Sequence, residues 1–340
     1  MRPRPGPRRK LPYLQQWNLT FDVWSTGPGV LPLLNPPNPH SDIVRLTHHC
    51  ILAEKFSTCD LSQRLLIAIS GIPGSGKTTL AASVVAGLNK LHHESRRKNF
   101  PNSPERDARR PDPSQPDIAL VIPLDGYHLT RKQLSEMPNA EEAIFRRGAA
   151  FTFDAKSYVD LVSNVRKPIS PETPTIHAPS FDHAVKDPVA HDIAIPPTTR
   201  IVLFEGLYTA LDADGWRDAH ALMDETWFIE VDIETATQRV AKRNFAAGIS
   251  KTFEECLART QQSDMRNARD ILDNRLPVQE IVPSVEDESW RGEQVMKVEG
   301  ELEENAQRQE DNDVDEVRLR RERMMRMDSI AALAADGVGL

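Results

Sequence analysis

Short, continuous apolar runs recur along the middle of the chain, and most of them are followed by a segment with helical spacing. The runs cover residues 64–70, 117–124, 200–207 and 226–231, with a shorter candidate at 279–282. Runs of this length, bounded by turn residues, are typical of strands buried on both faces of a parallel sheet. Because strands and helices alternate, we expect an α/β fold with a mostly parallel sheet covered by helices on both faces.

Three segments carry helical periodicity most clearly, namely 77–91, 234–245 and 252–276. Between the first of them and the next strand lie five prolines and many charged residues, which predict a solvated surface loop over 92–116. His92, at the start of this loop, is expected to be exposed to solvent.

The two ends of the chain differ in composition from the middle. Residues 1–60 form a proline-rich, basic extension with one short helical candidate at 41–55. Residues 286–340 are acidic and poor in aromatic residues, with a charged helical candidate at 315–333. We therefore expect one α/β domain over 61–285 between disordered or extended termini, and the acidic tail is a candidate for recruiting a partner protein.

Charge and composition exclude several classes of protein. The chain has a net charge of −8, and residues 284–340, with 16 acidic and 8 basic residues, account for all of it. The balanced remainder argues against a nucleic-acid-binding function, which needs a basic surface. Cys50, Cys59 and Cys256 lack CxxC spacing and predict neither a disulfide framework nor a zinc site.

The apolar runs are too short to span a membrane, which takes about 18 apolar residues, and no secretory signal is evident. We therefore expect a cytoplasmic protein that does not bind membranes. The first 21 residues carry five basic residues and no acid, as mitochondrial presequences do. Four prolines among the first twelve residues oppose the amphipathic helix that import requires, so a basic arm is the favoured interpretation.

The strongest motif stands between the first apolar run and the first helical segment. Residues 71–78 read Gly-Ile-Pro-Gly-Ser-Gly-Lys-Thr and match G-x-x-x-x-G-K-[ST] at every fixed position. In such a loop backbone N–H groups cradle phosphates, Lys77 reaches the β- and γ-phosphates, and the Thr78 hydroxyl is a ligand of Mg²⁺. The motif predicts a P-loop NTPase-type sheet that binds ATP and Mg²⁺. The predicted nucleotide-binding residues are Gly71, Gly74, Ser75, Gly76, Lys77, Thr78 and Thr79.

The segments around the loop narrow the class of P-loop protein. The sequence contains neither the guanine-reading N-K-x-D segment of GTPases nor an LSGGQ-like transporter signature. Asp125 follows the second predicted strand. Ligands of open α/β sheets bind in a crevice at the carboxyl ends of the strands, so a carboxylate at this position can face the transferred phosphate. Asp125 is therefore a candidate base. The alternative is a cap or turn residue, because Asp-Gly is a strong turn signal.

Over residues 65–285 the sequence resembles the superfamily of uridine kinase, phosphoribulokinase and bacterial-type pantothenate kinase, and most of all its uridine kinase-like or fructose kinase-like branch. The resemblance is carried by residues 121–128 (VIPLDGYH), 146–148 (RRG) followed by 153–154 (FD), and 202–207 (VLFEGL). It implies an ATP-dependent kinase in which Asp125 accepts the proton of the substrate hydroxyl and Glu205 lies near Mg²⁺. Burying Glu205 without a nearby cation would be costly, which independently favours the metal-linked role.

The remaining site candidates come from helix spacing and from position. Arg239 and Arg243 are four residues apart on one predicted helix face before Gly248, where they are candidates to clamp phosphates, Arg243 catalytically; a solvated face is the alternative. The superfamily places substrate-side structure in the proline-rich segment 173–197. Candidate substrate-binding residues are Tyr127, His128, Arg131, Arg147 and His177.

These observations favour an ATP-dependent kinase that transfers the γ-phosphate to a hydroxyl of a small metabolite, whether a nucleoside, a sugar or a pantothenate-like alcohol. The competing class is a non-kinase P-loop ATPase or a nucleotide-dependent interaction module. The sequence leaves a homodimer open. The two classes differ in whether Tyr127, His128, Arg131 and the 173–197 segment adjoin the P-loop.

Overall fold

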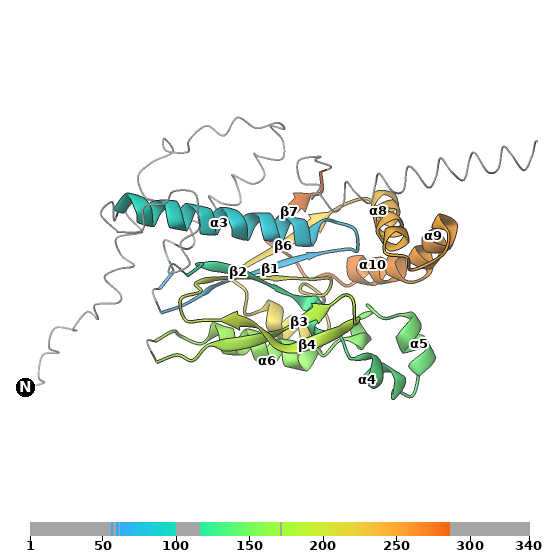
Figure 1. Cartoon of the computed structure of the whole chain (residues 1–340), viewed down its shortest axis with the longest axis horizontal. Helices are drawn as coiled ribbons and strands as arrows, with labels where there is room; N and C mark the ends of the chain where they lie inside the picture. Colours follow the sequence, from blue (N-terminus) through green and yellow to red (C-terminus); the bar gives the residue numbers. More distant parts are fainter. Residues whose placement is uncertain (1–55, 57–58, 61, 100–115, 171, 286–340) are drawn as a thin grey trace, which may run out of the picture.

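A computed structural model describes residues 56, 59–60, 62–99, 116–170 and 172–285. Five parallel strands form one sheet in the order β2-β5-β1-β6-β7 (Figure 1). They are β1 (Leu65–Gly71), β2 (Ala119–Pro123), β5 (Ile201–Glu205), β6 (Glu225–Glu230) and β7 (Glu280–Pro283). The predicted α/β class is thus confirmed. The helical candidates at 41–55 and 315–333 lie outside the described residues, and the domain boundaries stay predictions.

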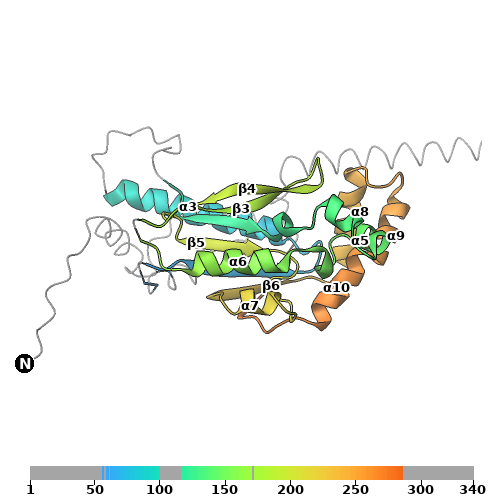
Figure 2. The ribbon, with the colours of Figure 1, turned by 90° about the horizontal axis from the view of Figure 1, so that it is seen from below.

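Helices cover both faces of the sheet. Helix α3 (Lys77–Asn99) lies on one face, whereas α6 (Ala155–Arg166) and α7 (Trp216–His220) lie on the other (Figures 1 and 2). Successive residues of a strand point to opposite faces, so Leu66 and Ile67 of β1 enter two different apolar clusters. This two-sided packing explains why all seven residues of β1 are buried.

Helix α3 is longer than the periodicity predicted. It continues to Asn99, through the first eight residues of the predicted surface loop 92–116, because no proline interrupts the chain before residue 101. The prediction that His92 is solvated is wrong, since this residue is only 3% exposed. Burial lowers the pKa of His92 to about 4.

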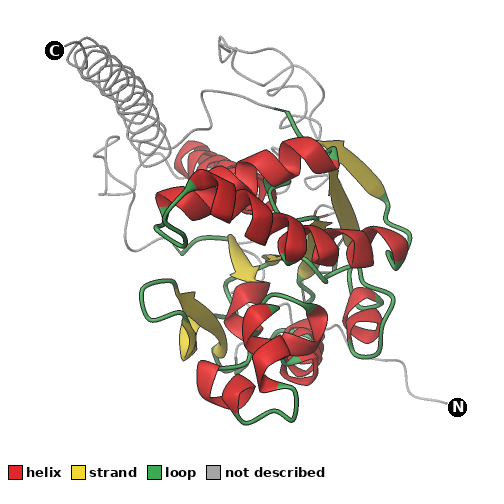
Figure 3. Cartoon of the chain, turned by 90° about the vertical axis from the view of Figure 1, so that its right-hand side faces the viewer, coloured by secondary structure: helices red, strands yellow, loops and turns green. Residues whose placement is uncertain are grey.

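Three helices pack together beyond the carboxyl ends of the strands: α8 (Ile233–Ala246), α9 (Phe253–Gln262) and α10 (Asp264–Asp273) (Figure 3). The single helix predicted over 252–276 is therefore wrong. The chain breaks at Ser263, which caps the end of α9 and the start of α10. The break redirects the chain so that α10 can bury one face in the core.

The proline-rich segment 173–197 forms an antiparallel hairpin of β3 (Ile176–Asp182) and β4 (Asp187–Ile195), separate from the main sheet. The hairpin packs against η1 (Leu124–Tyr127), the short 3₁₀ turn that follows β2. The approach is close, since a Cβ on Gly126 would lie 2.3 Å from the carbonyl oxygen of Pro179. Gly126 therefore permits this packing.

The segment between η1 and α6 supplies the remaining short elements. They are α4 (Arg131–Ser135), α5 (Ala140–Phe145) and η2 (Ala150–Thr152). Helix α4 begins with a reciprocal capping box between Thr130 and Gln133, and Asp154 caps the N-terminus of α6. Within the ranges that the structure describes, no helix combines the length and the apolar character needed to cross a bilayer.

Candidate active site

The strand register brings three chemically important segments to one edge of the sheet. Glu205, the last residue of β5, is paired with Ile69 of β1 on one side and with Pro123 of β2 on the other. The P-loop begins two residues after Ile69, and Asp125 lies two residues after Pro123. Because all five strands are parallel, these groups meet at the carboxyl edge, where open α/β sheets bind their ligands.

The P-loop needs glycine at positions 74 and 76 because of its backbone conformation, and at position 74 also because of a close contact. Gly74 and Gly76 have φ values of 78° and 92°, in the region that side chains rarely adopt. A Cβ on Gly74 would also lie 2.6 Å from the carbonyl oxygen of Ala236 in α8. Gly76, Thr78 and Thr79 are exposed, whereas Ser75 is buried and its Oγ has no hydrogen-bond partner among the described residues. The loop thus presents its backbone outward and retains an unpaired hydroxyl, which fits a phosphate ligand.

Lys77 is buried at the centre of the site, with 8% of its surface exposed. Its Nζ donates a hydrogen bond to the carbonyl oxygen of Ile72 at 2.9 Å. Burial lowers the pKa of Lys77 to about 8, although the neighbouring carboxylates of Glu205 and Asp125 act to raise it and Arg243 to lower it. Two carboxylates and an arginine from three different elements therefore share the electrostatic surroundings of Lys77.

Glu205 and Thr78 form the oxygen-rich part of the site. The Thr78 hydroxyl donates a hydrogen bond to Glu205 Oε1 at 3.2 Å, and Glu205 is only 6% exposed. Burial raises the pKa of the Glu205 carboxyl, an effect that Lys77 opposes. Mg²⁺ binds oxygen ligands, and it usually takes only one or two of them from the protein and the others from water and from the phosphates of the substrate. The Thr78 hydroxyl and the Glu205 carboxylate, beside a phosphate-binding loop, therefore fit this metal.

Asp125 is the most accessible carboxylate of this group, with its side chain half-exposed. His128 Nε2 lies 3.7 Å from Asp125 Oδ1, and the imidazole stacks on the Phe153 ring at a centroid distance of 3.9 Å. Burial lowers the pKa of His128 to about 4, even though Asp125 acts to raise it. The imidazole is therefore neutral at pH 7, and it does not neutralise the carboxylate beside it.

Tyr127 does not lie where the sequence predicted. It is 4% exposed and belongs to the apolar core, where its ring meets that of Tyr158 edge to face at 5.4 Å. In a 3₁₀ turn consecutive residues point about 120° apart, so Asp125 faces outward while Tyr127 faces inward. Tyr127 is thus a core residue in this structure, and its assignment as a substrate contact is corrected.

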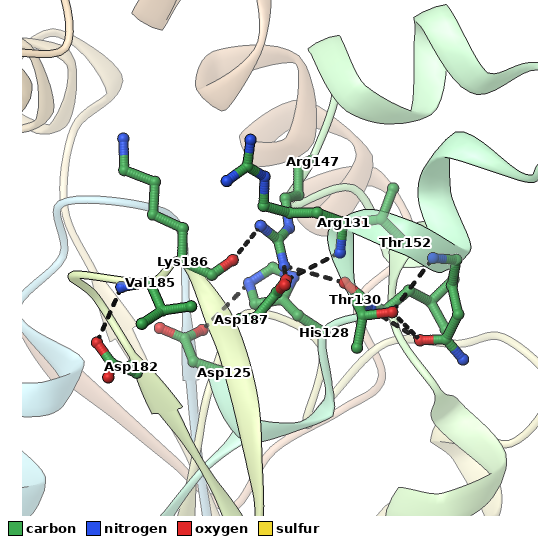
Figure 4. A network of polar contacts seen from close by, with 12 residues as sticks. Asp125, His128, Thr130, Arg131, Arg147, Thr152, Asp182, Val185, Lys186 and Asp187 are labelled. Carbon is green, nitrogen blue, oxygen red and sulfur yellow. Dashed lines mark hydrogen bonds and ion pairs between the residues drawn. The ribbon is translucent and has the colours of Figure 1, made fainter.

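Arg147 and the main chain of Arg131 are tied to the tip of the hairpin (Figure 4). The Arg147 guanidinium donates hydrogen bonds to Asp187 Oδ1 at 2.9 Å, to the carbonyl oxygen of Leu129 at 3.0 Å and to that of Lys186. The backbone N–H of Arg131 donates to the same Asp187 oxygen at 2.8 Å. This network holds the hairpin tip beside Asp125.

His177 is not brought to this cluster. It lies five residues before Asp182 on β3, which corresponds to about 16 Å along a strand. Its ring is exposed and stands edge to face with that of His191 at 6.5 Å. The structure therefore separates His177 from the other predicted substrate residues.

The two predicted clamp arginines of α8 have different surroundings. Arg239 Nη1 donates to the carbonyl oxygen of Gly74 at 3.3 Å and to Ser284 Oγ at 2.8 Å. Ser284 Oγ in turn donates to the carbonyl oxygen of Ser75 at 2.9 Å. Arg239 thus braces the P-loop main chain, whereas Arg243 is exposed and close enough to Lys77 to affect its pKa.

Sequence reasoning missed Lys186 and Ser284, and it assigned no role to Asp187. A weak signal for the hairpin was present, because Val189, Ile193 and Ile195 all fall on alternate positions of the second strand, but the prolines at 179 and 188 obscured it. No sequence signal identifies Ser284, whose partner Ser75 is 209 residues earlier in the chain.

Comparison with known proteins gives consistent results for sequence and fold. No family model matches the chain. The ATP-dependent kinase-like protein notR' of Aspergillus versicolor is 48% identical over 168 residues, which cover 49% of this chain and 95% of that protein. A candidate uridine kinase of Schizosaccharomyces pombe is 37% identical over 205 residues, covering 60% of this chain and 77% of that protein.

Two solved structures share the architecture. A candidate fructose transport system kinase from Silicibacter sp. has a TM-score of 0.55 and 28% identity, with 71% of this chain and 98% of that chain covered. YFH7 from Saccharomyces cerevisiae, described as a P-loop containing kinase with a circular permutation, has a TM-score of 0.60 and 23% identity, with 73% and 99% covered. The second likeness bears on the fold alone.

Proposed function

Because the chain belongs to the uridine kinase-like family of P-loop kinases, we propose that it transfers the γ-phosphate of ATP to a hydroxyl group of a small metabolite. The observation that carries the proposal is the convergence of Lys77, Glu205 and Asp125 at the carboxyl edge of the sheet. The names of its relatives refer to uridine and to fructose, and both compounds offer hydroxyl groups as acceptors.

In the proposed mechanism, the P-loop holds the phosphates of ATP. Backbone N–H groups of residues 74–78 bind phosphate oxygens, and the Lys77 ammonium leaves the carbonyl of Ile72 to reach the β- and γ-phosphates. Thr78 and Glu205 are the residues that would hold Mg²⁺, which when bound with ATP offsets the negative charge of the phosphates.

Asp125 acts on the acceptor. The acceptor oxygen forms a bond to the γ-phosphorus while the bond from that phosphorus to the β–γ bridging oxygen breaks and ADP leaves. The hydroxyl proton passes to the Asp125 carboxylate, which is accessible and has a neutral imidazole beside it. Most of the rate enhancement comes from holding the two reactants in line, because phosphoryl transfer needs little further chemistry from the protein.

Replacing Asp125 with asparagine tests this assignment. Asp125→Asn keeps the shape of the side chain and removes its basicity, so phosphoryl transfer should fall about a hundredfold, while ATP affinity stays near that of the wild type. ADP release and calorimetric ATP binding measure the two effects. Asp160→Asn, which removes an exposed carboxylate on α6, is the matched control.

Two results would argue against the proposal. Loss of ATP affinity in step with activity would make Asp125 a metal-binding or structural residue. Release of ADP at a rate independent of any hydroxyl compound, and unchanged in Asp125→Asn, would instead favour an ATPase without an acceptor.

A further inference from the structure

Two basic side chains near Asp125 have no ion-pair partner among the residues that the structure describes. They are Lys186, at the tip of the β3–β4 hairpin, and Arg131, the first residue of α4. Both are exposed. In Figure 4 the two side chains extend toward the same side, with Asp125 below Lys186.

The main chain of Lys186 is fixed while its side chain is free. Its backbone N–H donates to the carbonyl oxygen of Asp182 at 2.7 Å, and its own carbonyl accepts a hydrogen bond from Arg147. Its φ of 61° lies in the left-handed region that non-glycine residues rarely adopt. The backbone of Lys186 is thus held in place at the hairpin tip, and its ammonium group extends from there near Asp125, the candidate base.

Arg131 is anchored in the same way. Its backbone N–H donates to Asp187 Oδ1, and the capping box of Thr130 and Gln133 fixes the first turn of α4. No hydrogen bond or ion pair within the described part of the chain engages the Arg131 guanidinium. The position of its backbone is therefore set, and its five N–H donors remain available to a ligand.

The two acidic groups of the hairpin tip, Asp182 and Asp187, are already engaged. Asp187 accepts hydrogen bonds from the Arg147 guanidinium and from the backbone of Arg131, and Asp182 Oδ1 accepts from the backbone N–H groups of Ala184 and Val185. Arg147 is in turn committed to Asp187 and to two carbonyl oxygens. Neither carboxylate pairs with Lys186 or with the guanidinium of Arg131.

The nucleotide side of the site has cations of its own. Lys77 lies in the P-loop, Arg239 contacts the P-loop carbonyl of Gly74, and Arg243 lies close enough to Lys77 to influence it. Lys186 and Arg131 instead come from the hairpin and from α4, on the side of Asp125 where the acceptor would bind. They are placed to bind a group on the acceptor.

We propose that the acceptor carries an anionic group, a phosphate or a carboxylate, which Lys186 and Arg131 bind while Asp125 faces its hydroxyl. The inference rests on the proposed kinase function and specifies the acceptor as a phosphorylated or carboxylated alcohol. A charge-assisted pairing of this kind orients the acceptor, because the anionic group is fixed at one end and the reacting hydroxyl at the other.

Matched pairs of acceptors test this proposal in the full-length protein. Each pair differs in one anionic group: fructose and fructose 6-phosphate, uridine and uridine 5′-monophosphate, glycerol and glycerate. The measured quantity is kcat/KM for ADP release with saturating ATP and Mg²⁺. In at least one pair the anionic member should be used at least about tenfold better, the scale of one charge-assisted hydrogen bond. The phosphate and carboxylate pairs show which group is recognised.

Charge-removing variants tie the preference to these residues. Lys186→Gln and Arg131→Gln should each lower kcat/KM for the anionic acceptor about tenfold through KM, with KM for ATP unchanged. Lys132→Gln is the matched control, because it removes an 84%-exposed charge from the neighbouring position of the same helix. Lys186→Arg should restore much of the lost activity. Since both side chains are exposed, the melting temperature should not change.

The outcomes separate this inference from the kinase function itself. Efficient phosphorylation of neutral acceptors without preference for their anionic partners overturns the inference and leaves the kinase function intact, as does a rise in KM for ATP in the two variants. If ATP binds but no compound is phosphorylated, the proposed function fails for this set. Calorimetric binding of the three anionic compounds to the ADP complex then decides: binding that Lys186→Gln weakens about tenfold upholds the anion site, whereas no binding, or binding that the variant leaves unchanged, overturns it.

Discussion

A lysine that must be charged to bind phosphate is buried at the centre of this site. Removing the Lys77 ammonium from water favours its neutral form, and the carboxylates of Glu205 and Asp125 compensate in part. The pKa of Lys77, about 8 instead of 10.5, places its titration within an accessible pH range. Bound phosphates stabilise the charged form, so nucleotide affinity should be full below this pKa and fall above it.

We predict that ATP affinity is constant near pH 7 and falls about tenfold per pH unit once the pH exceeds the Lys77 pKa of about 8. Calorimetric titration with ATP and Mg²⁺ from pH 7 to about 9.5 measures this decline. Lys77→Arg, whose guanidinium stays protonated throughout, should bind with an affinity that does not vary over the range. A wild-type affinity that is independent of pH would show that Lys77 remains charged in the free protein.

At the scale of elements, the positions of Lys186 and of the other residues around the proposed acceptor site depend on how the β3–β4 hairpin packs against η1. The contact between Gly126 and Pro179 is close enough to exclude a Cβ, and the Arg147–Asp187 pair fixes the hairpin tip from the other side. The glycine after the candidate base thus serves tertiary packing. From the sequence alone, Asp-Gly indicates only a turn, so this packing role is visible only in the structure.

Gly126→Ala should displace the hairpin, because the added Cβ would lie 2.3 Å from a backbone oxygen that cannot rotate away. We expect a loss of about 1–3 kcal/mol of stability and a raised KM for the acceptor, with ATP affinity retained. Thermal unfolding and steady-state kinetics measure these effects. Gly248→Ala is a suitable control, because its φ of 65° disfavours alanine while no atom lies within 4 Å of the new Cβ, so it adds backbone strain without a clash. Equal rises in the KM for the acceptor in the two variants would rule out the hairpin displacement.

At the scale of the whole molecule, the P-loop is braced by the last described segment of the chain. Ser284 Oγ contacts both Ser75 and Arg239, and the Ser284 N–H donates to the carbonyl oxygen of Glu230 at 2.8 Å. Strand β7, which precedes Ser284, pairs with β6 at the edge of the sheet. The acidic tail that follows is poor in aromatic residues and rich in charge, and is not expected to contribute to the core.

Two truncations should therefore differ. A chain ending at residue 289 should keep its ATP affinity and melting temperature, because it retains every contact of Ser284. A chain ending at residue 282 should melt at a lower temperature and bind ATP more weakly, since the P-loop loses its brace. Calorimetry and thermal unfolding compare the two chains. Equal loss in both would mean that the segment beyond residue 289 also supports the site.

The sequence by itself determined the parallel α/β sheet and the P-loop, because both depend on neighbouring residues. Continuous apolar runs indicate strands that are buried on both faces of a sheet, and the residue spacing of Gly71–Thr78 indicates the backbone conformation of a phosphate-binding loop. These features were predicted within a few residues of their observed bounds. The break at Ser263 was not predicted, because packing against other helices decides it. The extension of α3 was not predicted either, because the charged residues before the first proline, at residue 101, were interpreted as part of the loop.

Only the tertiary structure decided which candidates come together. It placed Tyr127 in the core, left His177 far along β3, and brought Lys186 from the hairpin to the side of Asp125. Spacing along the chain cannot reveal these outcomes, since they depend on how the hairpin docks on η1 and on which way each residue of a short turn faces. Local patterns fix the elements, whereas contacts between residues far apart in sequence fix the side chains that share a site.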